Sequence, residues 1–221
     1  MITETLGPNL EQLFDYCGRK FSLKTVLMLA NQMIKRIEFC HNSRLIHRDV
    51  KPSNFRIGLG NKSHLLFMVN FRNATKYMSS TGKHLKFRDR QHSGGTMRYA
   101  SINSHVGIEC SRRDDLESLV YVLIYFLKGE LPWQNLKANS IEEKFAKILH
   151  TKVTMSVEEI CQGLPSQFKE LLSYARCLEY ESKPNYRLVK KKITTLFSSL
   201  QFQHDMDFDW NSVQKNAEAI S

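Results

Sequence analysis

The sequence has little of what marks disordered or fibrous proteins. Its 221 residues include only ten glycines and five prolines, while 42% are hydrophobic and 24% are charged. This balance excludes disordered and collagen-like chains and is typical of a soluble globular protein with one domain, or two small ones. We find no internal repeat and no break in composition that would mark a second domain.

Long apolar runs and a secretion signal are also missing. The longest apolar run, 119–127, has nine residues, whereas a helix needs roughly 20 to cross a bilayer. No basic residue precedes Arg19, so the charged start of a signal peptide is absent. We therefore expect no membrane partner and a cytoplasmic location, a nuclear one, or both.

Cysteines are few, odd in number and widely spaced, and no Cys-x-x-Cys occurs. This pattern favours reduced thiols, most of them buried as small hydrophobic side chains, over disulfides or a zinc site. The eight histidines also lack the spacing of metal ligands. The cysteines are Cys17, Cys40, Cys110, Cys161 and Cys177.

Positive charge is concentrated in one segment of a chain whose net charge is +10. Between residues 72 and 98, seven basic side chains face a single acid, Asp89. Such a segment attracts nucleic acid, acidic membrane or acidic protein, although a solvated loop without a ligand is an equal interpretation. Nucleic acid ranks third, because charge alone invites it and no RNA- or DNA-binding motif is present. The basic residues are Arg72, Lys76, Lys83, Lys86, Arg88, Arg90 and Arg98.

Hydrophobic periodicity predicts a helix over 22–41, followed by short strands at 44–46, 55–57 and 65–69. The only Gly-x-Gly, at 58–60, lies in a turn between two of these strands. It predicts a hairpin rather than a phosphate-binding loop, because no helix follows it directly.

The second half is expected to be helical, after a polar, glycine-punctuated loop over 70–107 whose length suggests a function. Ser111 and Asp114 have the spacing of a capping box before a buried helix that covers 116–127. Further helices are predicted at 141–150, 157–162, 166–178 and 186–200.

Residues 47–54, HRDVKPSN, carry the clearest chemistry. In phosphoryl transfer an aspartate in Asp49's place accepts the proton of a substrate hydroxyl, a lysine in Lys51's place neutralises the moving phosphoryl group, and an asparagine in Asn54's place ligates magnesium. The alternative interpretation is a polar loop between a helix and a strand.

With this loop in place, the sequence resembles the C-terminal lobe of the casein kinase I family, nearest the alpha type, from about residue 5 to residue 210. The most specific feature is SIN at 101–103, which stands where most protein kinases have Ala-Pro-Glu. The other matching segments are 6–11 (LGPNLE), 24–30 (KTVLMLA), 98–100 (RYA), 111–119 (SRRDDLESL), 131–134 (LPWQ) and 208–210 (FDW).

The resemblance implies an α+β, mainly α-helical fold: a truncated kinase domain over 1–210, without the N-terminal lobe, and a short polar tail over 211–221. It also implies ATP and magnesium as cofactors, with Leu6 and Asn54 at the nucleotide and Asn54 at the metal. Asp115 would brace the backbone of His47 and Arg48.

Several departures from the family predict that nucleotide binding is weak or absent. The sequence starts at the hinge, so we expect no Gly-rich loop, and apolar surface around 1–16 and 65–71 is left for a covering partner. Asn70-Phe71-Arg72 replaces the metal-holding Asp-Phe-Gly, and neutral Asn70 suits magnesium poorly. Val120 replaces a glycine, which adds volume at a cost of about 1–3 kcal/mol unless it is compensated.

Anion recognition is less affected than catalysis. By resemblance, Arg98 and Lys144 hold acidic or phosphorylated segments, although the family's glycine between them is Asn135 here. We therefore expect a catalytically impaired kinase homologue, a pseudokinase, that binds acidic or phosphorylated protein. The alternative is an active serine/threonine kinase that phosphorylates acidic or primed substrates with ATP.

Overall fold

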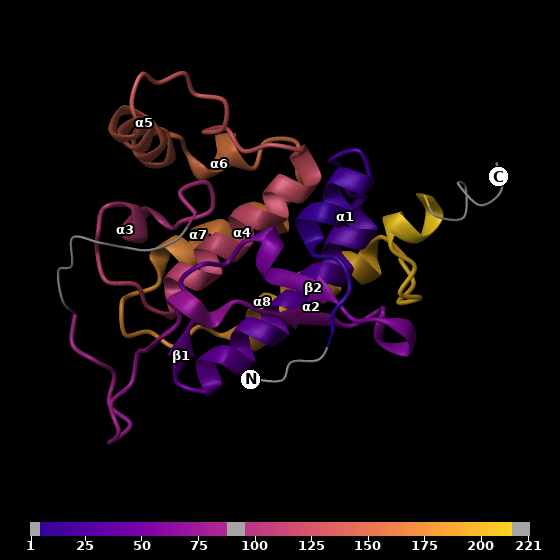
Figure 1. Cartoon of the computed structure of the whole chain (residues 1–221), viewed down its shortest axis with the longest axis horizontal. Helices are drawn as coiled ribbons and strands as arrows, with labels where there is room; N and C mark the ends of the chain where they lie inside the picture. The colour runs from indigo at the N-terminus through magenta and orange to yellow at the C-terminus, as the bar shows by residue number, and fades with distance from the viewer. Residues whose placement is uncertain (1–4, 88–95, 214–221) are drawn as a thin grey trace.

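Two long helices, α2 (Leu23–Asn42) and α4 (Arg112–Lys128), form the centre of the molecule in the computed structural model, which describes residues 5–87 and 96–213 (Figure 1). The predicted α+β, mainly α-helical fold is confirmed. The other helices are α1 (Leu10–Tyr16), α3 (Ile102–His105), α5 (Ile141–Thr154), α6 (Val157–Ile160), α7 (Ser166–Cys177) and α8 (Tyr186–Ser199).

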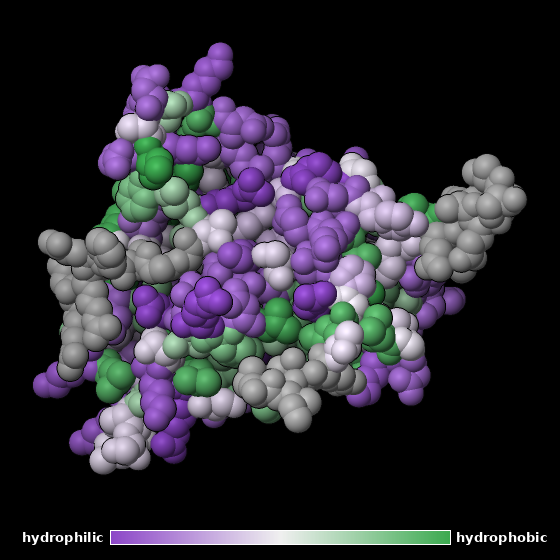
Figure 2. All heavy atoms as spheres, viewed as in Figure 1, coloured by the Kyte–Doolittle hydropathy of each residue, from purple (hydrophilic) through white to green (hydrophobic). Residues whose placement is uncertain are grey.

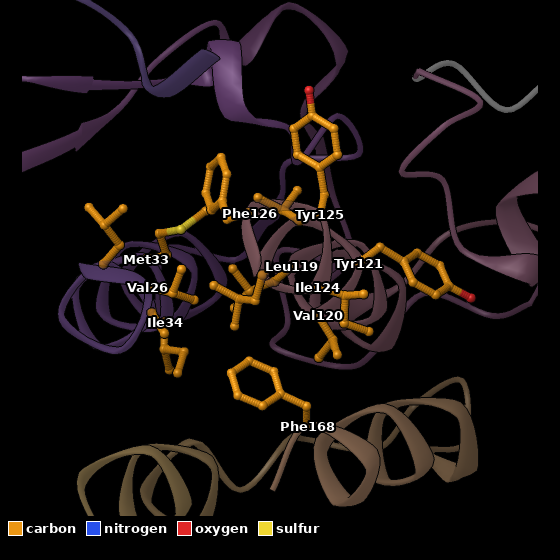
Figure 3. Close-up of a cluster of buried hydrophobic side chains, with 14 of the residues drawn as sticks. Val26, Met33, Ile34, Leu119, Val120, Tyr121, Ile124, Tyr125, Phe126 and Phe168 are labelled. Atoms are coloured by element: carbon orange, nitrogen blue, oxygen red, sulfur yellow. The ribbon is translucent and has the colours of Figure 1, made fainter. Parts of the chain in front are cut away.

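The core lies between these two helices and α7 (Figure 3). Met33 and Ile34 of α2 face Leu119 of α4, and Phe168 of α7 points toward them. Nearly all of α4 is buried, as its continuous apolar sequence predicts. Val120 belongs to this core and is 1% exposed.

The start of each central helix is capped by side chains. The Ser22 hydroxyl accepts a hydrogen bond from the Thr25 N–H at 3.2 Å, and Asp209, far along the chain, accepts the Ser22 N–H at 2.6 Å. At α4, the Asp114 carboxylate accepts the Ser111 N–H at 2.7 Å. These contacts satisfy donors that a helix start leaves free.

Two small antiparallel sheets lie beside α2. In one, β2 (Phe55–Ile57) pairs with β3 (Leu66–Met68), which confirms the predicted hairpin; in the other, β1 (Leu45–Ile46) pairs with β4 (Thr75–Lys76). Gly58 is required at the hairpin, because a Cβ there would lie 2.4 Å from the Lys62 carbonyl oxygen.

The structure corrects the expectation of an unbroken loop over 70–107, because β4 and α3 lie within it. It also adds α1, which periodicity did not predict. The helices α1 and α3 are short, so they contain too few residues for a hydrophobic period to be recognised. Arg88, Asp89 and Arg90 of the basic segment lie outside the described residues.

The predicted apolar surface is present only in part. Within 5–16 and 65–71, Tyr16 and Phe71 are exposed, whereas Leu10, Phe14 and Leu66 are buried. Residues 1–4 lie outside the described ranges.

All five cysteines are free, and Cys40, Cys110 and Cys161 are buried as predicted. Cys17 is half-buried, and Cys177 is exposed. Within the described ranges, no helix combines the length and apolarity that crossing a bilayer requires.

Candidate functional site

Asp115, in the first turn of α4, holds the start of the 47–54 loop. Its carboxylate accepts the N–H groups of His47 at 2.7 Å and of Arg48 at 2.8 Å. Arg48 has a φ of 66°, a left-handed conformation that is costly for a residue with a side chain. The two hydrogen bonds maintain this conformation and turn the chain toward Asp49.

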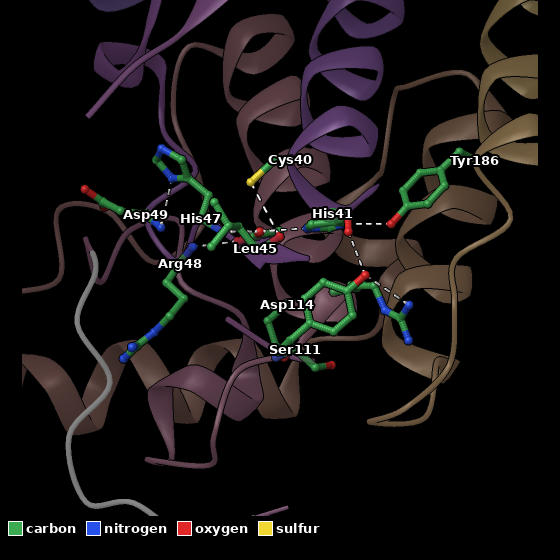
Figure 4. Close-up of polar contacts among 12 residues, drawn as sticks. Cys40, His41, Leu45, His47, Arg48, Asp49, Ser111, Asp114 and Tyr186 are labelled. Carbon is green, nitrogen blue, oxygen red and sulfur yellow. Dashed lines mark hydrogen bonds and ion pairs between the residues drawn. The ribbon is translucent and has the colours of Figure 1, made fainter. Parts of the chain in front are cut away.

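Three helices meet at this carboxylate through His41. The Nε2 atom of His41, on α2, lies 2.9 Å from Asp115 Oδ2, and its Nδ1 atom contacts the Tyr186 hydroxyl of α8 (Figure 4). Burial alone would raise the pKa of Asp115, but the hydrogen bond and electrostatic interaction with His41 and the N–H of His47 lower it below its usual value. Asp115 is therefore a charged anchor for the loop.

His47 connects the loop to the chain that follows β3. Its Nδ1 accepts the Asp49 N–H at 3.3 Å, so Nε2 carries the proton and donates to the Val69 carbonyl at 3.0 Å. The His47 ring also packs edge-on against Phe71, with 5.0 Å between centroids. Asn70 is thereby held close to the loop.

The Asp49 carboxylate is surrounded by donors. Oδ2 accepts from Asn54 Nδ2 at 3.0 Å and pairs with Lys51 Nζ at 2.9 Å. Oδ1 accepts from the Thr96 N–H at 3.3 Å and from its hydroxyl at 3.2 Å. Asp49, Lys51 and Asn54, which the motif singled out, are thus brought together, and Thr96 joins them from a distant segment.

The residues at the expected metal position do not fit magnesium. Asn70 is neutral, has a φ of 63°, and donates its amide N–H to Asn54 Oδ1 at 3.1 Å. That oxygen is the one with which Asn54 would ligate a metal. Over the described ranges, no group of three or more His, Cys, Asp or Glu side chains is placed to hold an ion. Magnesium would have to displace the Asn70 contact, with Asp49 alone supplying charge.

Leu6 lies on a segment that pairs with β2. The Gly7 N–H donates to the Ile57 carbonyl at 2.9 Å, and the Ile57 N–H donates to the Pro8 carbonyl at 3.1 Å. Arg56 Nε closes the same pairing by donating to the Gly7 carbonyl at 2.8 Å. Leu6 itself is half-buried.

A cavity of about 490 Å³ opens beside the loop and brings Arg98 and Lys144 together with Lys51. Sequence reasoning assigned the first two to an anion but did not place Lys51 with them, because only the fold reveals that proximity. The remaining lining residues are Glu11, Pro52, Ser53, Thr96, Met97, Tyr99, Trp133, Gln134, Asn135 and Ile148.

The charges of this cavity are unequal. Glu11, its one carboxylate, already accepts from the Tyr125 hydroxyl at 2.6 Å and lies 3.8 Å from Arg19. Burial favours a lower pKa for Arg98, but Tyr99 and Tyr125 raise it, so the guanidinium stays charged. Lys51 is already paired with Asp49, but Arg98 and Lys144 have no carboxylate partner among the ion pairs of the described residues. With Glu11 partly neutralised, these charges favour an anionic ligand.

In a comparison with protein-family models, residues 1–196 match the model described as the protein kinase domain. The match includes the loop, Asn70, the cavity and the start of α4.

Proposed function

This chain belongs to the protein kinase domain family, and on that premise we propose that it is a casein kinase I-like homologue that binds acidic or phosphorylated protein segments and is impaired in catalysis. Its ligand would occupy the cavity lined by Arg98, Lys144 and Lys51. The segments RYASIN and LPWQ, which carry the resemblance to casein kinase I, both contribute to this cavity.

The single observation that carries the anion-binding proposal is the convergence of three cations on one cavity. Arg98 comes from the segment before α3, Lys144 from α5 and Lys51 from the loop, so no local sequence pattern explains their proximity. A phosphoryl group offers several oxygens for charge-assisted hydrogen bonds, and guanidinium and ammonium groups suit it.

Impaired catalysis is supported by Asn70. Kinases stabilise the transferring phosphoryl group through metals and positioned cations, and here the carboxylate that would hold a metal is an amide that hydrogen-bonds Asn54. We therefore propose weak or absent binding of ATP and magnesium. Asn70 and its contact with Asn54 have this effect whatever chain precedes residue 1.

The proposal is tested by fluorescence anisotropy with a labelled phosphoserine peptide that has acidic flanks. Lys144→Glu and Arg98→Glu should each weaken binding by about 1.5–3 kcal/mol, the range for hydrogen bonds to charged groups. Lys147→Glu is a matched control, because it makes the same charge reversal on α5 outside the cavity. Asp49→Asn removes the carboxylate partner of Lys51 and should not weaken binding.

The alternative functions give different results. An active kinase would transfer phosphate to the same peptide in its unphosphorylated form and lose that activity in Asp49→Asn. Nucleic-acid binding would appear as affinity for a random oligonucleotide that falls steeply with salt. Equal affinity for phosphorylated and unphosphorylated peptides would refute the proposal.

A further inference from the structure

The two cations assigned to the anion lie on separate parts of the chain. Arg98 belongs to the segment 96–100, whereas Lys144 belongs to α5, at one side of the molecule (Figure 1). The buried residues of α5 are Ile148 and Lys152. The distance between the two cations therefore depends on how α5 is attached to the segment 96–100.

His105 of α3 holds the Lys144 end of α5 by donating to the Phe145 carbonyl at 3.0 Å, and the direct attachment of α5 to the segment 96–100 is made by Lys152. It is 0% exposed, and its Nζ donates to the Met97 carbonyl at 2.7 Å and to the Ala100 carbonyl at 2.6 Å. These carbonyls lie on either side of Arg98. The ammonium group also lies over the rings of Tyr121 and Trp133, 5.4 Å and 5.1 Å from their centroids.

Neighbouring side chains hold the rest of the segment. Trp133 Nε1 donates to the Arg98 carbonyl at 2.7 Å, and Glu117 accepts the Ile102 N–H at 3.2 Å. Arg176 donates to the Lys152 carbonyl at 3.1 Å, which fixes the end of α5 against α7. Among these contacts, those of Lys152 connect a side chain of α5 directly to the backbone of segment 96–100.

We propose that Lys152 is a positioning residue for the anion cavity, because its two hydrogen bonds set the separation between Arg98 and Lys144 that the bound anion must bridge. This inference rests on the proposed function of the cavity. It assigns Lys152 no contact with the ligand, and indeed Lys152 does not line the cavity.

Hydrophobic packing alone does not explain why the amine of Lys152 is buried. An unpaired buried charge is costly, and an apolar side chain of similar length would fill the space without that cost. Burial, aided by Arg176 and opposed by Glu117, lowers the pKa of Lys152 to about 7. Even a neutral amine keeps two N–H groups, which match the two carbonyls.

The charged state of Lys152 should also affect the ligand, because its charge lies behind the cavity. The ionisable groups that face it are Glu117 and Tyr121 of α4, Arg176 of α7 and His105 of α3. Burial and the charge of Lys152 lower the pKa of His105 to about 4, and burial raises that of Tyr121 well above its usual value. Neither titrates near pH 7.

The first measurement is the affinity of the chain for the phosphoserine peptide between about pH 7 and 8.5, where the phosphate, with a second pKa near 6, is mostly a dianion. Wild-type affinity should fall about threefold or more as Lys152 loses its proton. Lys152→Met should bind about tenfold more weakly at pH 7 and show no such fall. Lys147→Met, a matched loss of charge on α5, should keep both the affinity and the pH dependence.

The second measurement needs neither the ligand nor a Lys152 variant that folds. In a Trp210→Phe background, the emission of Trp133 reports on the adjacent amine and should change with a midpoint near pH 7. Lys152→Met, where circular dichroism verifies its fold, should abolish this change.

The outcomes separate the two proposals. The positioning role of Lys152 is overturned if Arg98→Glu weakens phosphopeptide binding while a folded Lys152→Met binds as tightly as the wild type. A wild-type chain whose affinity and Trp133 emission both stay constant with pH overturns the effect of the Lys152 charge on the ligand. If Lys152→Met fails to fold, Lys152→Gln, which keeps N–H donors at the end of a shorter side chain, takes its place, and an unchanged affinity in a folded Lys152→Gln overturns the positioning role. No phosphopeptide binding, together with a normal Trp133 titration, refutes the proposed function and with it the role of Lys152 in that function, while the Lys152 contact itself stands.

Discussion

Asp115 is a single carboxylate on which the backbone geometry of the whole loop depends. It accepts two main-chain N–H groups and pairs with His41 while 2% exposed. Because its pKa is lowered, this stability is present above the unfolded-state pKa and is lost as the pH falls through the lower folded-state pKa. Its two N–H partners would remain buried without it.

We predict that Asp115→Ala lowers the free energy of unfolding by about 3–5 kcal/mol, the cost of breaking a buried charged pair. Urea unfolding monitored by circular dichroism measures the change. Asp15→Ala removes an exposed carboxylate and serves as the control. A loss below about 1 kcal/mol would show that the loop holds its conformation by other means.

Asn70 offers the opposite kind of test, a gain of binding. We predict that Asn70→Asp creates a magnesium-dependent rise in melting temperature that the wild type lacks. The second carboxylate adds charge and can no longer donate to Asn54 Oδ1, which becomes free to ligate. Asn73→Asp introduces the same charge three residues later and should not respond to magnesium. A strong response of the wild type would contradict our proposal of impaired metal binding.

The loop residues could be predicted from sequence, but their partners could not. The order of Asp49, Lys51 and Asn54 is local, so a motif reveals it. Thr96 reaches Asp49 across 47 positions, and such a contact has no local pattern. Lys152 was also missed, because a lysine in a helix is normally a solvated charge.

Among the elements, α1 shows how a signal can be present and still be overlooked. Asn9 and Gln12 form a reciprocal capping box, with both hydrogen bonds at 3.0 Å. The Asn-x-x-Gln pattern is visible in the sequence and predicts a helix start. Periodicity, which succeeded for the long helices α2 and α8, had only seven residues here.

We predict that Asn9→Ala lowers the free energy of unfolding by about 1 kcal/mol, within the range of 0.5–2 kcal/mol for lost N-caps. Chemical denaturation of the two proteins measures the difference. Asn9→Ser should retain most of the stability, because serine also caps. If Asn9→Ala and Asn9→Ser are equally destabilised, the contribution of Asn9 does not come from capping.

The buried amine of Lys152 on α5 should also make the stability of the chain depend on pH in the absence of any ligand. A lysine with a lowered pKa binds fewer protons in the folded state, so the folded state should gain stability as the pH rises above about 7. The gain can reach about 1.4 kcal/mol per pH unit. We predict this slope for the wild type between about pH 7 and 8.5, and its absence in Lys152→Met.

The range of about pH 7 to 8.5 avoids the pH at which the cysteine thiols ionise. Burial raises the pKa values of Cys17 and Cys161 to about 11 and of Cys40 and Cys110 to about 12. Above about pH 9 these groups keep protons in the folded state and therefore oppose the gain. Parallel slopes for wild type and Lys152→Met below that pH would contradict the lowered pKa.

For the molecule as a whole, the exposed apolar residues determine its behaviour in solution. Figure 2 shows a mostly hydrophilic face with smaller hydrophobic patches between. Phe71 is 45% exposed and Tyr16 is 51% exposed, and Tyr16 edges a groove of about 430 Å³ that Leu13, Ile57 and Trp210 also line. A groove of this kind attracts hydrophobic surface.

We predict that the isolated chain binds a hydrophobic dye and self-associates as its concentration rises, and that Tyr16→Lys with Phe71→Lys reduces both. Dye fluorescence and sedimentation velocity measure the effects. Leu188→Lys, at a 38% exposed site on α8, is the control. A chain that is monomeric and does not bind the dye would contradict this prediction.

The mainly helical architecture could be predicted because the apolar residues of a long amphipathic helix recur in the sequence with the helical period. The pairing of β1 with β4 could not be predicted, since two-residue strands have no period and the paired residues lie 29 and 31 positions apart. The amount of apolar surface was overestimated for a related reason, because Leu10, Leu13 and Phe14 turn inward on α1, a helix that was not expected.

The contact between Ser22 and Asp209 sets an order in time as well as in space. The two residues are 187 positions apart, and a ribosome adds about 5–20 residues per second. Roughly 10 to 40 seconds therefore separate the synthesis of the start of α2 from that of the carboxylate that caps it. The apolar face of α2 stays uncovered until α4 and α8 have been made, which makes the nascent chain a substrate for chaperones, and the contact with Asp209 can form only after both helices.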